Sequence, residues 1–167
     1  ILSFNPPFGQ TGIAVEITAD NVSLDGFTVQ NSGTTANDVG ILLDDVTGNS
    51  IENNTVTSNA NGIVIALGSG NSITDNDVTS NSEYGIALLG TTTNTIELNT
   101  LDANSQTAIA LDNASVVGGP VTTGSTDNDI LENTISSSGN GGIFLGEYCD
   151  NNSITGGNTL DNITGVG

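Results

Sequence analysis

Carboxylates are almost the only side chains in this sequence that could do acid–base or metal chemistry. The chain has 167 residues, with 19 Asp and Glu, a single Cys, and no Lys, Arg or His. Two carboxylates at the right separation can hydrolyse a glycosidic bond. Carboxylate oxygens, together with amide and backbone carbonyls, are also the ligands that calcium prefers. Glycoside hydrolysis and calcium binding are therefore the two chemistries to weigh.

The candidate calcium ligands lie in the first third of the chain. They are five carboxylates that follow apolar segments: Glu16, Asp25, Asp44, Asp45 and Glu52. If successive repeats stack in register, Glu16 lies near Asp44 and Asp25 lies near Glu52, at about one strand spacing of 4.8 Å. Calcium would relieve this repulsion, and the alternative is that these groups are solvated surface charges screened by salt. No other cofactor is expected.

Catalysis by these carboxylates is not expected, and no catalytic residue is assigned. A glycosidase needs a general acid with a raised pKa, which usually requires a pocket with apolar walls. A chain with only 4% aromatic residues offers little enclosure on its surface. Asp44, Asp45 and Glu16 are the residues that a carboxylate-only glycosidase would use.

The composition also excludes two classes of partner. Phosphate recognition relies on Lys and Arg, so nucleic acid is excluded, and the same reasoning excludes an anionic membrane surface. No run of apolar residues is long enough for membrane insertion. Cys149 is the single cysteine, so no disulfide can form within the chain.

The elements that must position these residues come from an internal repeat. A short apolar phrase opened by Gly or Ala returns six times with a basic period of 22 to 23 residues: Gly12-Ile-Ala-Val15, Gly40-Ile-Leu-Leu43, Gly62-Ile-Val-Ile65, Gly85-Ile-Ala-Leu88, Ala108-Ile-Ala-Leu111 and Gly142-Ile-Phe-Leu145. A fixed period in this range is typical of a solenoid. Two insertions interrupt it, at residues 30–39 and 112–127.

Each repeat contains three short strands. Apolar residues alternate with small or polar ones at period two, which indicates β-strands and not helices. Two further apolar columns follow each phrase. The second strand is marked by Leu24, Ile51, Ile73, Ile96, Ile130 and Ile154, and the third by Val29, Val56, Val78, Leu101, Ile135 and Leu160.

Asparagine recurs at two corners of the repeat. One column precedes the second strand (Asn49, Asn71, Asn94, Asn128, Asn152), and the other lies between the second and third strands (Asn54, Asn76, Asn99, Asn133, Asn158). Asn tolerates left-handed backbone conformations and suits sharp turns. Stacked Asn amides can also hydrogen-bond along the stack, as in cross-β ladders. Two asparagine ladders are therefore predicted.

These features resemble a known repeat. The phrase N-S-I-x-x-N-x-V-x-S-N-x-x-G-I, seen at residues 49–63 and again at 71–86, is similar to the parallel β-helix repeat of the pectate-lyase-like superfamily, which includes carbohydrate-binding and sugar-hydrolase modules. The resemblance implies an all-β, right-handed, single-stranded parallel β-helix of about six coils, with three strands per coil. Residues 1–167 would form one domain, with 1–11 as a partial coil or cap.

The catalytic motifs of that superfamily are not present here. Its lyases and epimerases resemble one another in using Arg, Lys or His, and its galacturonan hydrolases carry His- and Lys-bearing motifs; this chain has none of these residues. We therefore expect a non-catalytic member.

The predicted function is structural. An uncovered terminal coil is an open β-edge that pairs with other strands. Either the protein continues with more coils, or copies of the chain stack end to end. We expect the second, with assembly into a filament, sheath or surface layer outside the cell or on its surface. The alternative is a glycan-binding or polysaccharide-processing module, although Tyr84 and Tyr148 are expected at different corners. Candidate N-glycosylation sites are Asn21, Asn53, Asn113, Asn151 and Asn162.

Overall fold

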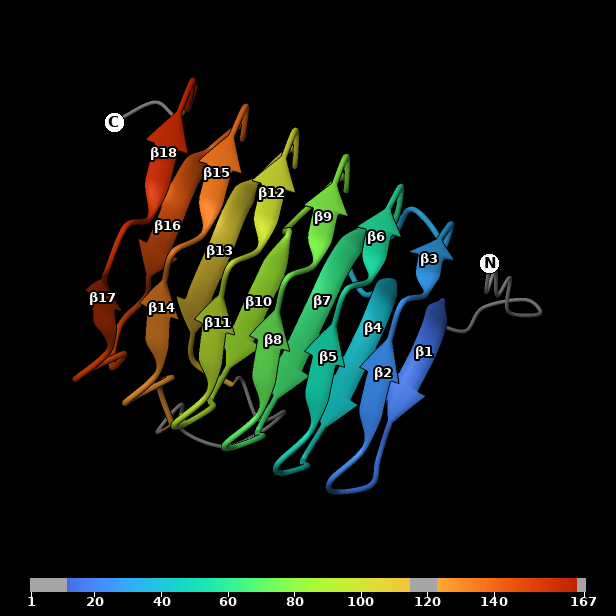
Figure 1. The fold of residues 1–167 in the computed structure, drawn as a ribbon, viewed down its shortest axis with the longest axis vertical. Coiled ribbons are helices and arrows are strands. Elements are labelled where there is room, and N and C mark those ends of the chain that lie inside the picture. Colours follow the sequence, from blue (N-terminus) through green and yellow to red (C-terminus); the bar gives the residue numbers. More distant parts are fainter. Residues whose placement is uncertain (1–11, 115–122, 165–167) are drawn as a thin grey trace.

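The computed structural model describes residues 12–114 and 123–164, and in these ranges the protein is an all-β solenoid of six coils (Figure 1). Three six-stranded parallel sheets run along it, as the sequence predicts. The proposed cap at 1–11 and the middle of the second insertion, 115–122, lie outside the described residues. No helix in the described part is long and apolar enough to cross a membrane.

Each coil contributes one strand to each sheet. The first sheet contains β1 (Ile13–Ile17), β4 (Val39–Asp44), β7 (Asn61–Ala66), β10 (Ile86–Leu89), β13 (Thr107–Asp112) and β16 (Gly141–Leu145). The second contains β2 (Ser23–Asp25), β5 (Ser50–Glu52), β8 (Ser72–Thr74), β11 (Thr95–Glu97), β14 (Asp129–Leu131) and β17 (Ser153–Thr155). The third contains β3 (Thr28–Gln30), β6 (Thr55–Thr57), β9 (Asp77–Thr79), β12 (Thr100–Asp102), β15 (Thr134–Ser136) and β18 (Thr159–Asp161).

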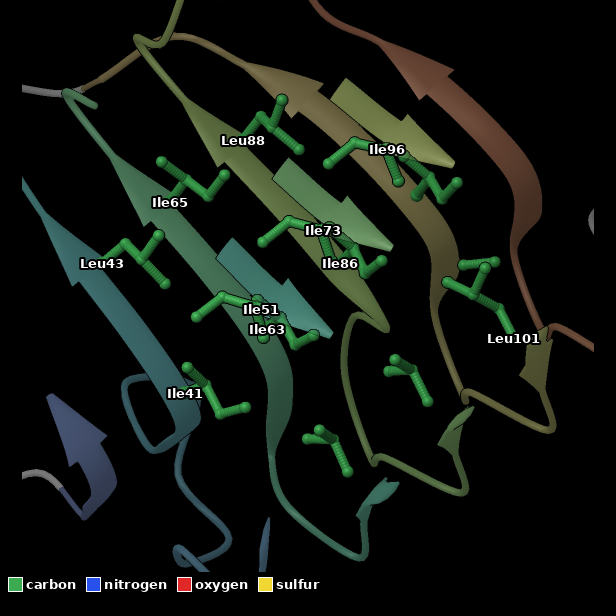
Figure 2. Packing of buried hydrophobic residues seen from close by; sticks show 14 of the residues in the cluster. Ile41, Leu43, Ile51, Ile63, Ile65, Ile73, Ile86, Leu88, Ile96 and Leu101 are labelled. Carbon is green, nitrogen blue, oxygen red and sulfur yellow. The ribbon is translucent and has the colours of Figure 1, made fainter. Parts of the chain in front are cut away.

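The core is a set of aliphatic columns that run along the solenoid axis (Figure 2). In the second sheet, for example, Ile51 pairs with Ile73 and Ile73 with Ile96, and all three side chains are fully buried. β-branched side chains suit this arrangement because they pack well on a pleated surface. The apolar residues of the period-two pattern are thus the residues on the inward face of each strand.

The register of the first coil differs from the repeat alignment read from the sequence. Val15, and not Ile13, pairs with Ile41, and Ile17 pairs with Leu43. Ile17 belongs to the main core, whereas Ile13 packs with an apolar cluster outside it. The sequence is ambiguous here because Ile13, Val15 and Ile17 alternate, so either register places an aliphatic residue inside.

Asparagine side chains link the coils at three corners. In the corner between the second and third strands, Asn54 Nδ2 donates to Asn76 Oδ1 at 3.0 Å, and Asn76 Nδ2 donates to Asn99 Oδ1 at 3.0 Å. The corner before the second strand has the same geometry, with Asn71 Nδ2 donating to Asn94 Oδ1 at 3.0 Å. These chains of amides satisfy polar groups that are buried inside the turns, except at Asn49, whose buried Nδ2 has no partner among the described residues.

A third ladder lies after the third strand, and the sequence analysis missed it. Asn59 Nδ2 donates to Asn81 Oδ1 at 3.2 Å, and Asn81 Nδ2 donates to Asn104 Oδ1 at 2.9 Å. The signal was available in the Asn that follows the third strand of each central repeat, at Asn59, Asn81 and Asn104. It is weaker than the other two columns because Ser32 and Ser138 occupy the equivalent positions in the first and last full repeats.

The ladder asparagines are not themselves the left-handed residues of the turns. The left-handed conformation falls on the preceding residue, for example Asn53 (φ 56°) before Asn54 and Asp75 (φ 56°) before Asn76. Asn is therefore selected at the ladder positions for its paired donor and acceptor, and the strain is carried by its neighbour.

The glycine that opens the repeat phrase is required by close stacking. A Cβ atom on Gly62 would lie 2.4 Å from the carbonyl oxygen of Gly85 and 2.7 Å from Cγ1 of Val78. These distances are too short for any side chain, so glycine lets the backbone of one coil approach the next.

Replacing Asn76 by alanine is expected to lower the free energy of unfolding by about 3 kcal/mol, because it removes the acceptor of Asn54 N and the donor to the carbonyl oxygen of Ile51. Urea unfolding followed by far-UV circular dichroism measures this loss. Asn140→Ala, at an exposed site outside the ladders, is the control and is expected to change stability by under about 0.5 kcal/mol. Equal effects of the two substitutions would contradict the role of the ladder.

Candidate functional site

An apolar groove lies on the outer face of the first sheet. Its volume is about 220 Å³. It is lined by residues of β4, β7 and β10 and of the segment before β4: Ala36, Asn37, Val39, Asn61, Val64, Tyr84, Ala87 and Leu89. The three strands lie side by side in the middle of the solenoid (Figure 1).

The floor of the groove is an outward-facing apolar column. Leu42 pairs with Val64, and Val64 pairs with Ala87, so these side chains stack on the outer face of neighbouring strands. Val64 and Ala87 are only 6% and 3% exposed, although they point away from the core. With Val39 they form a second apolar cluster, to which Leu89 is attached. An outward face of this kind is unusual, because solvent-facing strand positions are normally polar.

The walls of the groove are a polar loop and an aromatic ring. Ala36 and Asn37 of the loop at residues 31–38 line the groove. Asn61 holds this loop, because its Nδ2 donates to the carbonyl oxygens of Ala36 at 2.8 Å and Asp38 at 3.1 Å. Tyr84 also lines the groove and is 37% exposed. The site thus combines an apolar floor, one aromatic face and amide groups.

Asp38 fixes the wall from inside. Its side chain is buried, and its carboxylate accepts hydrogen bonds from the backbone N–H of Gly12 and, at 2.7 Å, from that of Thr35. Burial alone would raise the pKa of Asp38, but the hydrogen bonds from Gly12, Thr35 and Thr34 outweigh it, and the pKa lies below its ordinary value of 3.8. Sequence reasoning missed Asp38, because its partners, the backbone N–H groups of Gly12 and Thr35, are not located by any sequence pattern.

Two residues with carboxylates neighbour groove-lining residues but do not line the groove themselves. Asp112 of β13 pairs with Leu89, and its carboxylate lies close to the position where a Cβ on Gly146 would be, on the side of β13 away from Leu89. Glu83 directly precedes Tyr84, is half-buried, and its Oε2 accepts a hydrogen bond from Gln106 Nε2 at 3.1 Å. Neither residue was singled out from the sequence.

The five proposed calcium ligands do not come together. Glu16 pairs with Leu42, so its expected proximity to Asp44 was wrong, and the cause is the shifted register of the first coil. Asp44 pairs instead with Ala66. Within residues 12–114 and 123–164, no three His, Cys, Asp or Glu side chains are grouped so that they could hold a metal ion.

Asp25 and Glu52 are paired neighbours in adjacent coils. This pair was predicted from the sequence, and Asn53 Nδ2 donates to Asp25 Oδ1 at 2.9 Å. Asp45 is an exposed corner residue in the left-handed conformation.

The remaining sequence candidates are dispersed over the surface. Of the glycosylation candidates, Asn21, Asn53, Asn151 and Asn162 are exposed and Asn113 is half-buried. Tyr148 is 60% exposed and does not line the groove. Cys149 is a free, half-buried thiol whose Sγ lies near the carbonyl oxygen of Glu147.

Three parallel sheets wound around one aliphatic core and tied by asparagine ladders define a single-stranded parallel β-helix. Among such proteins, this chain belongs to the family described as periplasmic copper-binding protein (NosD), whose model matches residues 8–115. No curated protein matches the chain.

Solved structures of a periplasmic alginate epimerase, AlgG, share the fold. One structure of the enzyme has a TM-score of 0.75 and 17% identity over 93% of this chain. A point mutant has a TM-score of 0.79, also at 17% identity, over 89% of this chain. The chain spans 36% of the length of each of these structures. Both descriptions are of periplasmic proteins, in coarse agreement with the location outside the cytoplasm expected from the sequence.

The residues of this chain do not fit the copper in the family's description. Copper sites in proteins are built from imidazole, thiolate and thioether groups. This chain has no His and no Met, and it has one Cys. Its carboxylates and amides suit hard cations instead, so no copper chemistry is assigned to these coils.

Replacing Asp38 by asparagine is expected to lower the free energy of unfolding at neutral pH by about 2 kcal/mol, because an amide cannot accept from both buried N–H groups as a carboxylate does. Since the folded pKa is below the unfolded one, the stabilisation by Asp38 is complete above the unfolded value, near 4, and is lost as pH falls through the folded pKa. Melting temperatures across this range measure it.

The difference in melting temperature between the wild type and Asp38→Asn should therefore become smaller as the pH falls below about 4. Asp77→Asn, at an exposed position of β9, is the matched control. A difference between wild type and Asp38→Asn that stays constant down to low pH would contradict this account.

Proposed function

We propose that this chain is a non-catalytic β-helix module that acts outside the cytoplasm and binds a glycan in the groove on the first sheet. The observation that carries the proposal is the combination of an apolar floor with Tyr84 and the amides of Asn37 and Asn61. A sugar ring presents apolar C–H faces and polar hydroxyls. Concave sites with apolar walls and a few fixed polar groups suit such ligands.

The comparisons support this proposal at the level of the scaffold. AlgG is named as an epimerase of alginate, a polysaccharide, and it shares the solenoid at 17% identity. The NosD family is described as periplasmic. At least one periplasmic protein with this fold therefore acts on a polysaccharide.

The absence of catalysis is part of the proposal. Asp38 is the buried carboxyl in the wall of the groove, and its pKa is lowered, which is the wrong direction for a general acid. Its oxygens are engaged by backbone N–H groups of the loop. It is therefore suited to holding the wall and not to transferring a proton.

The charge of the chain selects among glycans. With 19 carboxylates and no Lys, Arg or His, the chain carries a formal charge of −19. A polyuronate such as alginate would be repelled unless a cation bridged it to the surface. The ligand we propose is therefore not an anionic glycan.

A second candidate function is self-assembly by coil stacking into a filament, sheath or surface layer. The observation that favours it lies in the last described coil. Ile154 and Leu160 are 41% and 51% exposed, whereas the equivalent Ile130 and Ile135 of the preceding coil are fully buried. A further coil stacked in the same register would cover this apolar surface, and in the assembly proposed here that coil comes from another copy of this chain.

Replacing Tyr84 by alanine is expected to weaken glycan binding by at least about fivefold, because an aromatic contact contributes roughly 1 kcal/mol beyond its buried area. Titration calorimetry with neutral oligosaccharides identified on a glycan array measures this change. Tyr148→Ala is the matched control, since Tyr148 is exposed outside the groove. Undiminished binding by Tyr84→Ala would exclude this groove as the site.

Replacing Leu160 by aspartate is expected to abolish end-to-end assembly, because it places a charge on the surface that the next copy would cover. Light scattering after size exclusion and negative-stain electron microscopy measure assembly. Leu98→Asp, at an exposed corner in the middle of the solenoid, is the control. A wild-type protein that stays monomeric at high concentration would contradict the stacking proposal.

A further inference from the structure

One polar atom of the groove has no hydrogen-bond partner in the described part of the chain. Asn61 lines the groove and is only 6% exposed, and its Nδ2 group donates to the carbonyl oxygens of Ala36 and Asp38. Within residues 12–114 and 123–164, no group donates a hydrogen bond to Oδ1 of the same amide. This oxygen is not fully buried, so a ligand in the groove can reach it.

The two hydrogen bonds of Nδ2 determine which end of the Asn61 amide a ligand meets. A side-chain amide has two N–H donors and one acceptor oxygen. Rotating this amide by a half turn would place its oxygen against two carbonyl oxygens, so the donors stay on the loop and the acceptor is left for a ligand. A ligand that covers this oxygen without supplying an N–H or O–H is expected to bind at least about fivefold more weakly than one that supplies it.

The surroundings of Asn61 favour a donor that is attached to an apolar group. Tyr84 occupies in the next coil the position that Asn61 occupies in its own, about one strand spacing away. Val64 and Ala87 form the floor of the groove and belong to one apolar cluster. A hydroxyl group supplies a donor but no apolar surface for this floor. An acetamido group supplies both, because its N–H and its methyl group belong to one planar unit.

The size and the lining of the groove agree with a ligand of this kind. Its volume of about 220 Å³ is below the range of about 300 to 1,000 Å³ that is typical of pockets for drug-sized ligands, so it suits one sugar residue with its substituent. None of the lining residues is charged. A neutral substituent therefore finds partners on the lining, whereas an ionised one finds no opposite charge there.

We infer that the ligand of this groove is a neutral glycan that contains an N-acetylated amino sugar. This inference rests on the proposed glycan-binding function and names its ligand class. The acetamido N–H donates to Asn61 Oδ1, the acetamido methyl group packs on Val64 and Ala87, and the sugar ring lies against Tyr84. The interaction is reversible, and no bond is made or broken.

The test compares three sets of oligosaccharides of equal length and linkage by titration calorimetry on the wild-type chain: N-acetylglucosamine oligomers, glucose oligomers, and glucose oligomers that are O-acetylated at position 2. The O-acetyl ester keeps the methyl group and loses the N–H, so it is expected to bind at least about fivefold more weakly than the N-acetyl oligomers. Unmodified glucose oligomers also lose the methyl contact, worth about a further fourfold. Equal affinity for the N-acetyl and O-acetyl sets would overturn the inference.

Ala87→Leu is expected to weaken binding of the N-acetylglucosamine oligomers at least about tenfold, because the larger side chain occupies the space of the acetamido methyl group. Ala110→Leu is the matched control. Ala110 pairs with Ala87 in the neighbouring strand β13 and is 4% exposed, close to the 3% of Ala87, but it does not line the groove. Far-UV circular dichroism checks that both variants are folded. Equal losses of affinity in the two folded variants would place the ligand elsewhere and overturn the inference.

The outcomes separate this inference from the function on which it rests. Binding only of glycans that lack an acetamido group, lost in Tyr84→Ala, would keep the glycan groove and overturn the acetamido ligand. Binding of no neutral glycan on an array would overturn both. Binding of N-acetylated peptides in preference to every glycan would overturn both in favour of a protein partner.

Discussion

Stacking of equivalent residues in register, one strand spacing apart, is the constraint on which this structure depends. Each side chain has copies of its own kind, or their closest equivalents, above and below it along the axis. In-register stacking stabilises aliphatic residues, because equivalent side chains such as Ile51, Ile73 and Ile96 bury one another in one continuous column. The same stacking destabilises charged residues, because it places like charges in neighbouring coils, where they repel one another, as for Asp25 and Glu52.

Asparagine resolves the same constraint for polar groups. Its amide carries both a donor and an acceptor, so identical side chains complement one another, which carboxylates or ammonium groups cannot do. Asn99 shows the full pattern, since it receives a bond from Asn76 and donates to Asn133 Oδ1 at 3.0 Å. Buried polar corners are thereby compatible with a narrow aliphatic core, and the turns are held without ion pairs, which this chain has no cations to form.

The fold could be predicted from the sequence because in-register stacking requires similar residues at equivalent positions of every coil. The three apolar columns and two of the asparagine columns were visible as recurrences, and recurrence does not depend on any single residue. It was insufficient wherever one coil departs from the others. In the first coil, Ile13, Val15 and Ile17 are all aliphatic residues that could pair with Ile41. The sequence does not distinguish these registers, and in the structure Val15 is the partner of Ile41.

The groove could not be derived for a related reason. The outward residues Leu42, Val64 and Ala87 lie between inward ones, so the phrase reads as a continuous apolar run, which is what a strand buried on both faces also shows. What makes this run a site is the loop at residues 31–38, and Asp38 holds that loop through backbone N–H groups that no sequence pattern locates. The insertion at residues 30–39 interrupts the repeat, and two of its residues, Ala36 and Asn37, help to form the groove on the outer face of the sheet.

Charge and architecture are linked through this surface. A solenoid with 19 carboxylates and no cations must keep its charges on corners and outward positions, where solvent screens them. On the first sheet, the outward positions of β4, β7 and β10 are occupied instead by the aliphatic residues Leu42, Val64 and Ala87, and the carboxylate of this column, Glu16, is in the first coil. The stacking rule thus produces an apolar strip on the outer face of the first sheet.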